Sequence, residues 1–331
     1  MLPYTFVKKG DLSISPIETS KDAIEQPDLA KHEDMYIPPL GSSVIISGKS
    51  GSGKSTLLAN LLLDGRFYGP SEAKPKGWFE KIFLFSPTAN GDDVQKSLKI
   101  PKKYVFTDLD EAAELLDVIL NSQQEKIDSA VGADKVAQFA IIFDDVIGDT
   151  RFMNEKAFTR CFYQVRHVNC TTFICTQHFR RVPKICRLQA NFVFFFQGSA
   201  AEVEIVTEEY APPIMSKNQF RQLVNDASGQ KHTFLTINNK VGYDKRFRKN
   251  LDEFIQLPQF TELDDGHTGG KKEEQKKCDW NNKEEGRDSD PEQEEEWLKT
   301  AGVHVTEQYG AAEQETFGGL ASRGLRGGSH R

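Results

Sequence analysis

Eight consecutive residues near the start of the chain have the composition and spacing of a phosphate-binding loop. They match the pattern G-x-x-x-x-G-K-[ST] (Walker A) with Gly48, Lys49, Ser50, Gly51, Ser52, Gly53, Lys54 and Ser55, and Thr56 follows directly. Small residues let successive backbone N–H groups curl around phosphate oxygens, and the start of the following helix adds a partial positive charge. We therefore predict that residues 48–56 bind the phosphates of ATP. The Lys54 ammonium would reach the β- and γ-phosphates, and the Ser55 hydroxyl would coordinate Mg²⁺.

Two further stretches indicate which kind of phosphate-binding protein this is. The apolar run Phe139–Phe143 ends in Asp144 and Asp145, as a Walker B strand would. In this interpretation Asp144 coordinates Mg²⁺ and Asp145 orients the water that attacks the γ-phosphate, although paired acids can also be simple turn residues. The run Thr172–Thr176 ends in Gln177, whose amide could sense the γ-phosphate or could be a loop residue without a role. A carboxylate after the magnesium ligand indicates transfer to water, so we predict ATP hydrolysis.

The elements that must position these residues alternate between short apolar runs and longer stretches with helical spacing. Leu57, Leu58, Leu61 and Leu62 form one helical stripe, and Ala112, Leu115, Leu116 and Ile119 form another. Such alternation is typical of a parallel sheet wrapped by helices. We predict an α/β P-loop NTPase fold of the ASCE/RecA-like type, with a mostly parallel sheet. The expected strands are Val44–Ser47, Ile82–Ser86, Phe139–Asp144, Thr172–Thr176, Asn191–Gln197 and Thr233–Ile237.

Charge and composition divide the chain into parts. The 331 residues carry a net charge of -7, and residues 262–331 alone hold 17 acidic and 10 basic side chains. The C-terminal stretch is therefore responsible for the whole net charge, and it is too charged and Gly-rich to bury much surface. We predict an N-terminal arm over 1–38, a P-loop ATPase domain over 39–260, and a disordered acidic and Gly-rich tail over 261–331.

Cysteine usage and hydropathy bear on the cellular compartment. The five cysteines form no CxxC pair, so a disulfide framework is not expected, and we predict Cys170 and Cys175 to be small buried hydrophobes. The first residues lack the apolar stretch of a signal peptide, and the aromatic run Phe192–Phe196 is too short to cross a bilayer. We expect an intracellular protein without a membrane partner.

Residues 151–187 form a basic segment that contains a single acid. Its basic residues are Arg151, Lys156, Arg160, Arg166, Arg180, Arg181, Lys184 and Arg187. Such a segment could supply arginine fingers to a neighbouring subunit, contact DNA phosphates, or be a solvated basic face. We predict Arg166 and Arg187 as finger candidates and Arg180 and Arg181 as DNA contacts. A second cluster could be a further DNA or pore surface, or could serve solubility: Lys240, Lys245, Arg246, Arg248 and Lys249.

These motifs together resemble the poxvirus-type viral genome-packaging ATPases, a family within the FtsK/HerA superfamily. The resemblance extends from about Leu40 to Phe196. Beyond the phosphate-binding loop and the acid pair, it rests on Phe85-Ser86-Pro87-Thr88, Arg166-His167, and Thr176-Gln177 followed by Val182-Pro183, Arg187 and Asn191.

The resemblance implies a homo-oligomeric ring that hydrolyses ATP with Mg²⁺ and pumps double-stranded DNA into a preformed capsid. Its partners would be DNA and capsid or portal-vertex proteins, and its location would be the site of virion assembly in the host cell. Other functions stay open: an ATP-dependent assembly scaffold or switch, a HerA-like helicase or translocase unconnected with packaging, or a nucleic-acid kinase.

Overall fold

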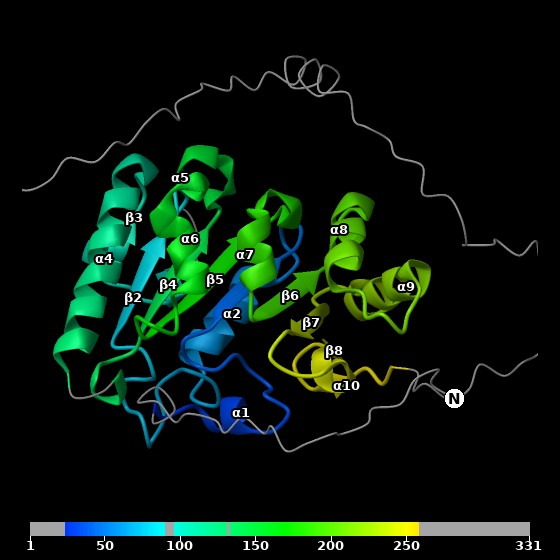
Figure 1. The fold of residues 1–331 in the computed structure, drawn as a ribbon, viewed down its shortest axis with the longest axis horizontal. Helices are drawn as coiled ribbons and strands as arrows, with labels where there is room; N and C mark the ends of the chain where they lie inside the picture. Colours follow the sequence, from blue (N-terminus) through cyan, green and yellow to red (C-terminus); the bar gives the residue numbers. More distant parts are fainter. Residues whose placement is uncertain (1–23, 90–95, 131–132, 258–331) are drawn as a thin grey trace, which may run out of the picture. The chain divides into compact units, whose positions relative to one another are not determined.

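One large sheet organises the part of the chain that the computed structural model describes, residues 24–89, 96–130 and 133–257. Its nine strands in these ranges lie in the order β3-β2-β4-β5-β1-β6-β7-β8-β9 (Figure 1). The first six of these are parallel, and the last three join antiparallel. Their bounds are β1 Ser43–Ser47, β2 Lys81–Phe85, β3 Val105–Phe106, β4 Phe139–Asp144, β5 Cys170–Thr176, β6 Phe192–Phe196, β7 Phe234–Asn238, β8 Phe247–Lys249 and β9 Glu253–Phe254.

The central strands are apolar because both faces of the sheet are covered. Side chains alternate along each strand, so Ile45 of β1 joins one hydrophobic cluster while Val44 and Ile46 join the other. The first cluster contains apolar residues of the helices from α4 to α9, and the second contains those of α2 and of the segment around Ile37. The sheet is thus the middle layer of a three-layer α/β fold.

The helices lie on both faces of this sheet (Figure 1). Their bounds are α1 Asp28–Lys31, α2 Lys54–Leu63, α4 Leu109–Ser129, α5 Thr150–Asn154, α6 Lys156–Tyr163, α7 Lys184–Gln189, α8 Ala200–Tyr210, α9 Lys217–Ser228 and α10 Tyr243–Arg246. Short 3₁₀ turns lie at η1 Lys102–Tyr104, η2 Ala133–Lys135, η3 Val146–Gly148 and η4 Phe179–Arg181. The predicted stripes on α2 and α4 face the core, since Leu58, Leu61 and Leu116 are buried.

The predicted fold class is confirmed, and each of the six expected strands is present with its ends shifted by at most two residues. Three strands were not predicted, β3, β8 and β9, and none is longer than three residues. Strands this short carry too little periodicity to be recognised in a sequence. Cys170 and Cys175 are buried, as expected.

The predicted domain boundaries stay predictions. Residues 1–23 of the arm and all of 261–331 lie outside the described residues. The described end of the arm packs on the fold, because Ala30 and Ile37 are buried and the carbonyl of Pro38 accepts a hydrogen bond from the buried Tyr68 hydroxyl. Across the described ranges we find no helix that is both long and apolar enough to span a membrane.

Candidate active site

The phosphate-binding loop connects the end of β1 to the start of α2. It is anchored on the sheet, since the Gly48 amide donates to the carbonyl of Thr176 at 3.0 Å. A Cβ on Gly48 would lie 2.4 Å from Cβ of Phe196, so only glycine fits there. Gly51 and Gly53 have positive φ angles of 71° and 110°, which glycine adopts without strain. The glycines of the motif therefore give the chain its tight turn into the helix.

Lys54 is held against the loop that contains it. Its side chain is buried, and Nζ donates to the carbonyl oxygens of Gly48 at 2.8 Å and Lys49 at 3.0 Å. Burial lowers the pKa of Lys54, and the charges of Cys175, Asp145 and Asp144 partly oppose this change. The ammonium thus lies within electrostatic reach of the acid pair.

The acid pair lies at the carboxyl end of β4, which is separated from β1 by β5. β4 and β5 are parallel neighbours in register, so Asp144 is opposite Cys175 and Asp145 lies close to Gln177. The Gln177 amide Nε2 donates to the two carboxylate oxygens of Asp145 at 3.3 and 3.4 Å. Asp145 is exposed and has a positive φ of 55°, which turns the chain away directly after the strand. Its carboxylate can therefore reach a water molecule over the site.

The two residues predicted to bind Mg²⁺ line one small pocket, and their role stays a prediction. Ser55 and Asp144 line the same small pocket, with a hydroxyl and a carboxylate that are both hard oxygen ligands. In the described ranges no group of three or more His, Cys, Asp or Glu side chains could hold a metal. Two protein ligands suit Mg²⁺, which takes its other ligands from phosphate oxygens and water. When bound, the ion would neutralise phosphate charge.

Two residues next to the phosphate-binding loop belong to no sequence motif that would identify them as part of the site. Phe196 ends β6 beside Gly48, and His232 lies in the turn before β7, with Nδ1 3.2 Å from the carbonyl oxygen of Ser52. They reach the loop because β6 pairs with β1 and β7 pairs with β6. Only the strand order brings them there.

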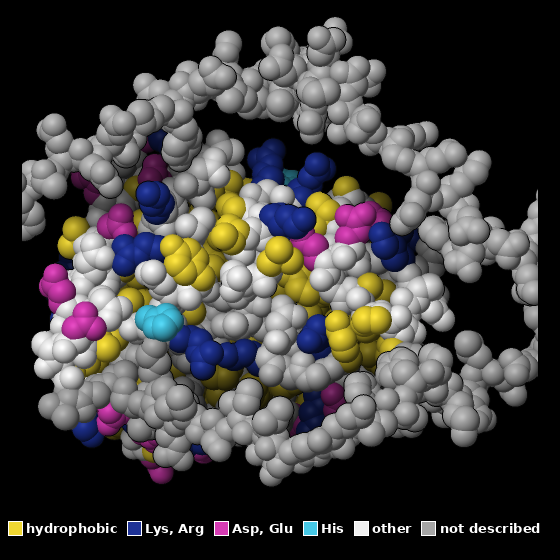
Figure 2. All heavy atoms as spheres, in the orientation of Figure 1, with side chains coloured by type: hydrophobic (Ala, Val, Ile, Leu, Met, Phe, Trp, Pro, Cys, Tyr) yellow, Lys and Arg dark blue, Asp and Glu magenta, His cyan; other side chains and the backbone are white. Residues whose placement is uncertain are grey.

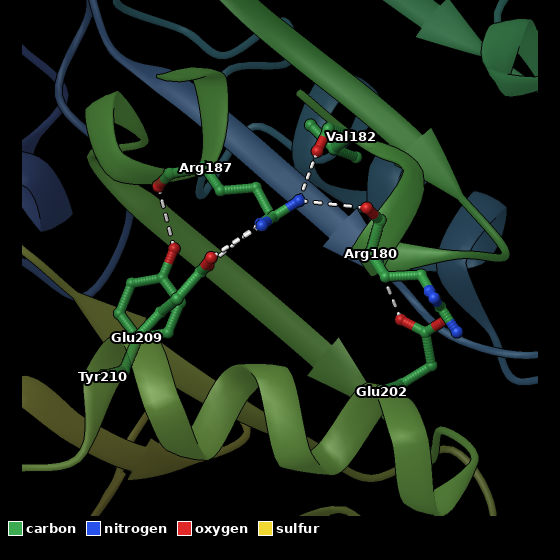
Figure 3. Close-up of polar contacts among 6 residues, drawn as sticks. All are labelled: Arg180, Val182, Arg187, Glu202, Glu209 and Tyr210. Atoms are coloured by element: carbon green, nitrogen blue, oxygen red, sulfur yellow. Dashed lines mark hydrogen bonds and ion pairs between the residues drawn. The ribbon is translucent and has the colours of Figure 1, made fainter. Parts of the chain in front are cut away.

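The prediction that Arg187 is an arginine finger is wrong, because its side chain is used inside the protein (Figure 3). The guanidinium pairs with Glu209 of α8, with Nη2 2.6 Å from Oε1 and Nε 2.9 Å from Oε2. It also donates to the carbonyl of Arg180 at 3.0 Å and to that of Val182 at 2.5 Å. Both side chains of the ion pair are about nine-tenths buried. Arg187 therefore joins α7 to α8 and cannot extend into another subunit.

Arg166 is exposed and lies near the amino end of β1, whereas the phosphate-binding loop follows the carboxyl end of that strand. A Cβ on Gly41, which precedes β1, would be 3.5 Å from its Cα, whereas the loop follows the other end of β1. Arg166 therefore cannot reach the phosphates of its own chain, so its finger role stays a prediction about a neighbouring copy.

The remaining basic residues divide between internal partners and the surface. Arg160 pairs with Asp117 of α4 at 2.5 Å. Arg248, from the second cluster, is fully buried and donates to backbone carbonyls of the segment before β1, so the reading of that residue as a DNA or solubility surface is wrong. Arg180 and Arg181 are exposed after β5. Figure 2 shows Lys and Arg side chains interspersed with apolar ones on the face of the molecule that it views.

The sheet and the loop define a P-loop NTPase fold. A family model described as "Poxvirus A32 protein" matches residues 42–256, which is more than half of the chain. The chain belongs to this family, and the resemblance predicted from the sequence is confirmed.

The chain is also similar to viral proteins of unassigned role. It is 26% identical over 157 residues to uncharacterized protein 015R of Frog virus 3 (isolate Goorha), across 47% of this chain and 44% of that protein. It is 26% identical over 200 residues to uncharacterized protein 088R of Invertebrate iridescent virus 3, across 60% of this chain and 70% of that protein. The chain thus spans less than half the length of the Frog virus 3 relative.

Solved structures with a similar arrangement include two ATPases. B204, the DNA-packaging ATPase from Sulfolobus Turreted Icosahedral Virus, matches with a TM-score of 0.44 and 13% identity, over 64% of this chain and 97% of that one. EccC (ATPases 2 and 3) from Thermomonospora curvata matches with a TM-score of 0.42 and 9% identity, over 65% of this chain and 37% of that one.

Proposed function

We propose that this protein is an ATPase whose hydrolysis cycle drives double-stranded viral DNA into a preformed capsid. The observation that carries the proposal is the convergence of Lys54, Asp145 and Gln177 at the carboxyl ends of adjacent parallel strands. Membership of the Poxvirus A32 protein family supports it. The partners would be DNA, further copies in a ring, and capsid or portal-vertex proteins at the site of virion assembly in the host cell.

Each residue of the site has a separate task in hydrolysis. Backbone amides of the loop bind the phosphates, and Lys54 exchanges its carbonyl partners for phosphate oxygens when ATP enters. Asp145 accepts a hydrogen bond from the attacking water and orients it in line with the γ-phosphate. Gln177 directly follows β5, and its amide donates a hydrogen bond to the Asp145 carboxylate. This amide therefore links the γ-phosphate side of the site to the basic turn η4 that follows.

Hydrolysis is tested with Asp145→Asn. The amide keeps the size of the side chain but removes the negative charge, so ATP binding should stay within about twofold while turnover falls by about 10²-fold or more. Asp226→Asn, an exposed acid on α9, serves as the matched control and should leave both unchanged. Full turnover in the Asp145 variant would contradict the assignment.

Coupling to DNA is tested separately, with Arg180→Ala combined with Arg181→Ala. Both side chains are exposed in η4, which follows Gln177 by two residues. Turnover should rise with double-stranded DNA in the wild type, and the double variant should lose that stimulation and reduce the salt dependence of DNA binding by about one to two phosphate contacts. Lys217→Ala is the control. DNA binding that does not depend on salt would favour the scaffold or switch, and strand separation would favour the helicase.

A further inference from the structure

The turn η4 lies between the end of β5 and the start of α7, and contacts with α8 hold it in place (Figure 3). It begins two residues after Gln177 and contains Arg180 and Arg181, whose side chains are exposed. A movement of this turn would therefore displace Gln177 and the two proposed DNA contacts together.

The Gln177 side chain has little support from packing. It is exposed, and its hydrogen bonds to the Asp145 carboxylate are long, at 3.3 and 3.4 Å. Hydrogen bonds of this length are weak, so the backbone that carries Gln177 decides whether its amide faces the acid pair. That backbone reaches Arg180 three residues later. The position of the Arg180 peptide therefore affects the geometry on the γ-phosphate side of the site.

The backbone of Arg180 is hydrogen-bonded through both its amide and its carbonyl. The amide donates to Oε2 of Glu202 at 2.9 Å, and the carbonyl accepts from the Arg187 guanidinium at 3.0 Å. Arg187 is paired in turn with Glu209. Glu202 and Glu209 are seven residues apart, so they lie on the same face of α8, and Figure 3 shows both carboxylates directed from this helix toward η4 and α7. Helix α8 thus fixes the Arg180 peptide from two positions.

The direct contact, from Glu202, uses a carboxylate that could have served its own helix. The residues Ser199-Ala200-Ala201-Glu202 match the capping-box pattern, in which the glutamate side chain accepts from the amide of the N-cap residue. Here the Ser199 hydroxyl accepts from the Glu202 amide, while the Glu202 carboxylate accepts from Arg180. The residue is only 4% exposed, and a buried carboxylate needs hydrogen-bond donors. Glu202 therefore joins the helix to the turn.

The same end of α8 also contacts the phosphate-binding loop. The Lys49 amide donates to the carbonyl of Gln197 at 3.4 Å, and α8 begins at Ala200. A Cβ on Gly198 would lie 2.9 Å from Cβ of Glu202, so the link between β6 and α8 packs closely against this side chain. Glu202 is thus connected on one side to the loop that binds phosphates and on the other to the turn that follows Gln177.

We propose that Glu202 is a positioning residue that couples the ATPase site to the DNA contacts. The proposal rests on the proposed function. By accepting from the Arg180 amide, Glu202 holds η4 in place, and the turn in this position keeps the Gln177 amide facing the acid pair. Without the acceptor, the Asp145 carboxylate loses its fixed orientation, and DNA bound at η4 no longer changes the rate of hydrolysis. The residues that bind the phosphates are not altered, so ATP binding stays the same.

The test compares Glu202→Met with Glu202→Gln, two side chains of similar length. Glutamine keeps an oxygen that accepts from the Arg180 amide, whereas methionine has only a weakly accepting thioether. A hydrogen bond to a charged acceptor changes an equilibrium by about tenfold or more. Basal ATP turnover of the Met variant should therefore fall by about tenfold, and its stimulation by double-stranded DNA should disappear. The Gln variant should keep the stimulation and stay within about threefold of wild-type turnover. Glu208→Met, at an exposed acid of the same helix, is the control and should change neither.

Calorimetry with ATP and Mg²⁺ separates a positioning role from a general loss of structure. ATP affinity should change by less than about twofold in both Glu202 variants, with urea unfolding as the measure of folding. Glu202→Ala is a second variant without the acceptor and should show the same two losses as the Met variant. Wild-type turnover and stimulation in the Met and Ala variants, equal losses in the Gln variant, or a parallel loss of ATP affinity would overturn the positioning role and leave the proposed function intact. If the wild type hydrolyses no ATP, or DNA does not stimulate it, the proposed function fails, and this inference fails with it.

Discussion

Replacing Arg187 by alanine should destabilise the fold far more than it affects the chemistry of hydrolysis. The variant leaves the Glu209 carboxylate without its partner at a position where both side chains are about nine-tenths buried. It also removes the guanidinium from the carbonyls of Arg180 and Val182. Removing one member of a buried ion pair costs about 3–5 kcal/mol of unfolding free energy, which is a large share of the stability of a typical domain.

Urea unfolding measures this loss. With a slope of about 3 kcal/mol per molar, the midpoint should fall by about 1–2 M. Glu209→Gln should lose a comparable amount, and the double variant Arg187→Met with Glu209→Leu should recover part of it, because no uncompensated charge is left. Arg166→Ala, an exposed arginine, is the control and should change the free energy of unfolding by less than about 0.5 kcal/mol. Wild-type stability of the Arg187 variant together with lost turnover would refute this reasoning and restore the finger role.

Three further outcomes follow from the site and the core. Gly48→Ala should abolish ATP binding and lower stability, because its Cβ would lie 2.4 Å from that of Phe196, and calorimetry and urea unfolding would detect the two losses. Burial lowers the pKa of Lys54 in the free protein and bound phosphate should raise it, so ATP affinity should fall as pH rises through the lowered value, in a titration from about pH 7 to 10. Burial raises the pKa of Cys170 and Cys186 to about 12, so at pH 8 neither should react with a thiol reagent until the protein is denatured, as mass spectrometry of the labelled chain would show.

The core of the site could be predicted from the sequence because its signals are local. The loop pattern after β1, the acid pair at the end of β4 and Gln177 after β5 each occupy a few consecutive residues at a strand end. Parallel strands place such ends at one edge of the sheet, so predicting the strands was enough to predict that these residues meet.

The rest depended on pairings between distant segments. His232 is 180 residues from Ser52 in the chain, and its contact arises only because β7 pairs antiparallel with β6. Arg187 was predicted as an arginine finger because it lies in a basic segment. Its partner Glu209 lies on another helix, and nothing in the local sequence pattern indicates that the two side chains meet. The prediction for Arg248 of β8 was wrong for the same reason, because a run of basic residues does not show which of its side chains is buried.

Calorimetric titration of the purified full chain with ATP and Mg²⁺ tests the central claim most directly. Saturable binding at one site per chain, lost in Lys54→Ala while that variant stays folded in urea unfolding, is the result predicted by the geometry of the loop. An absence of heat from binding in the wild type, or unchanged affinity in the Lys54 variant, would contradict the assignment of residues 48–56 as the triphosphate site.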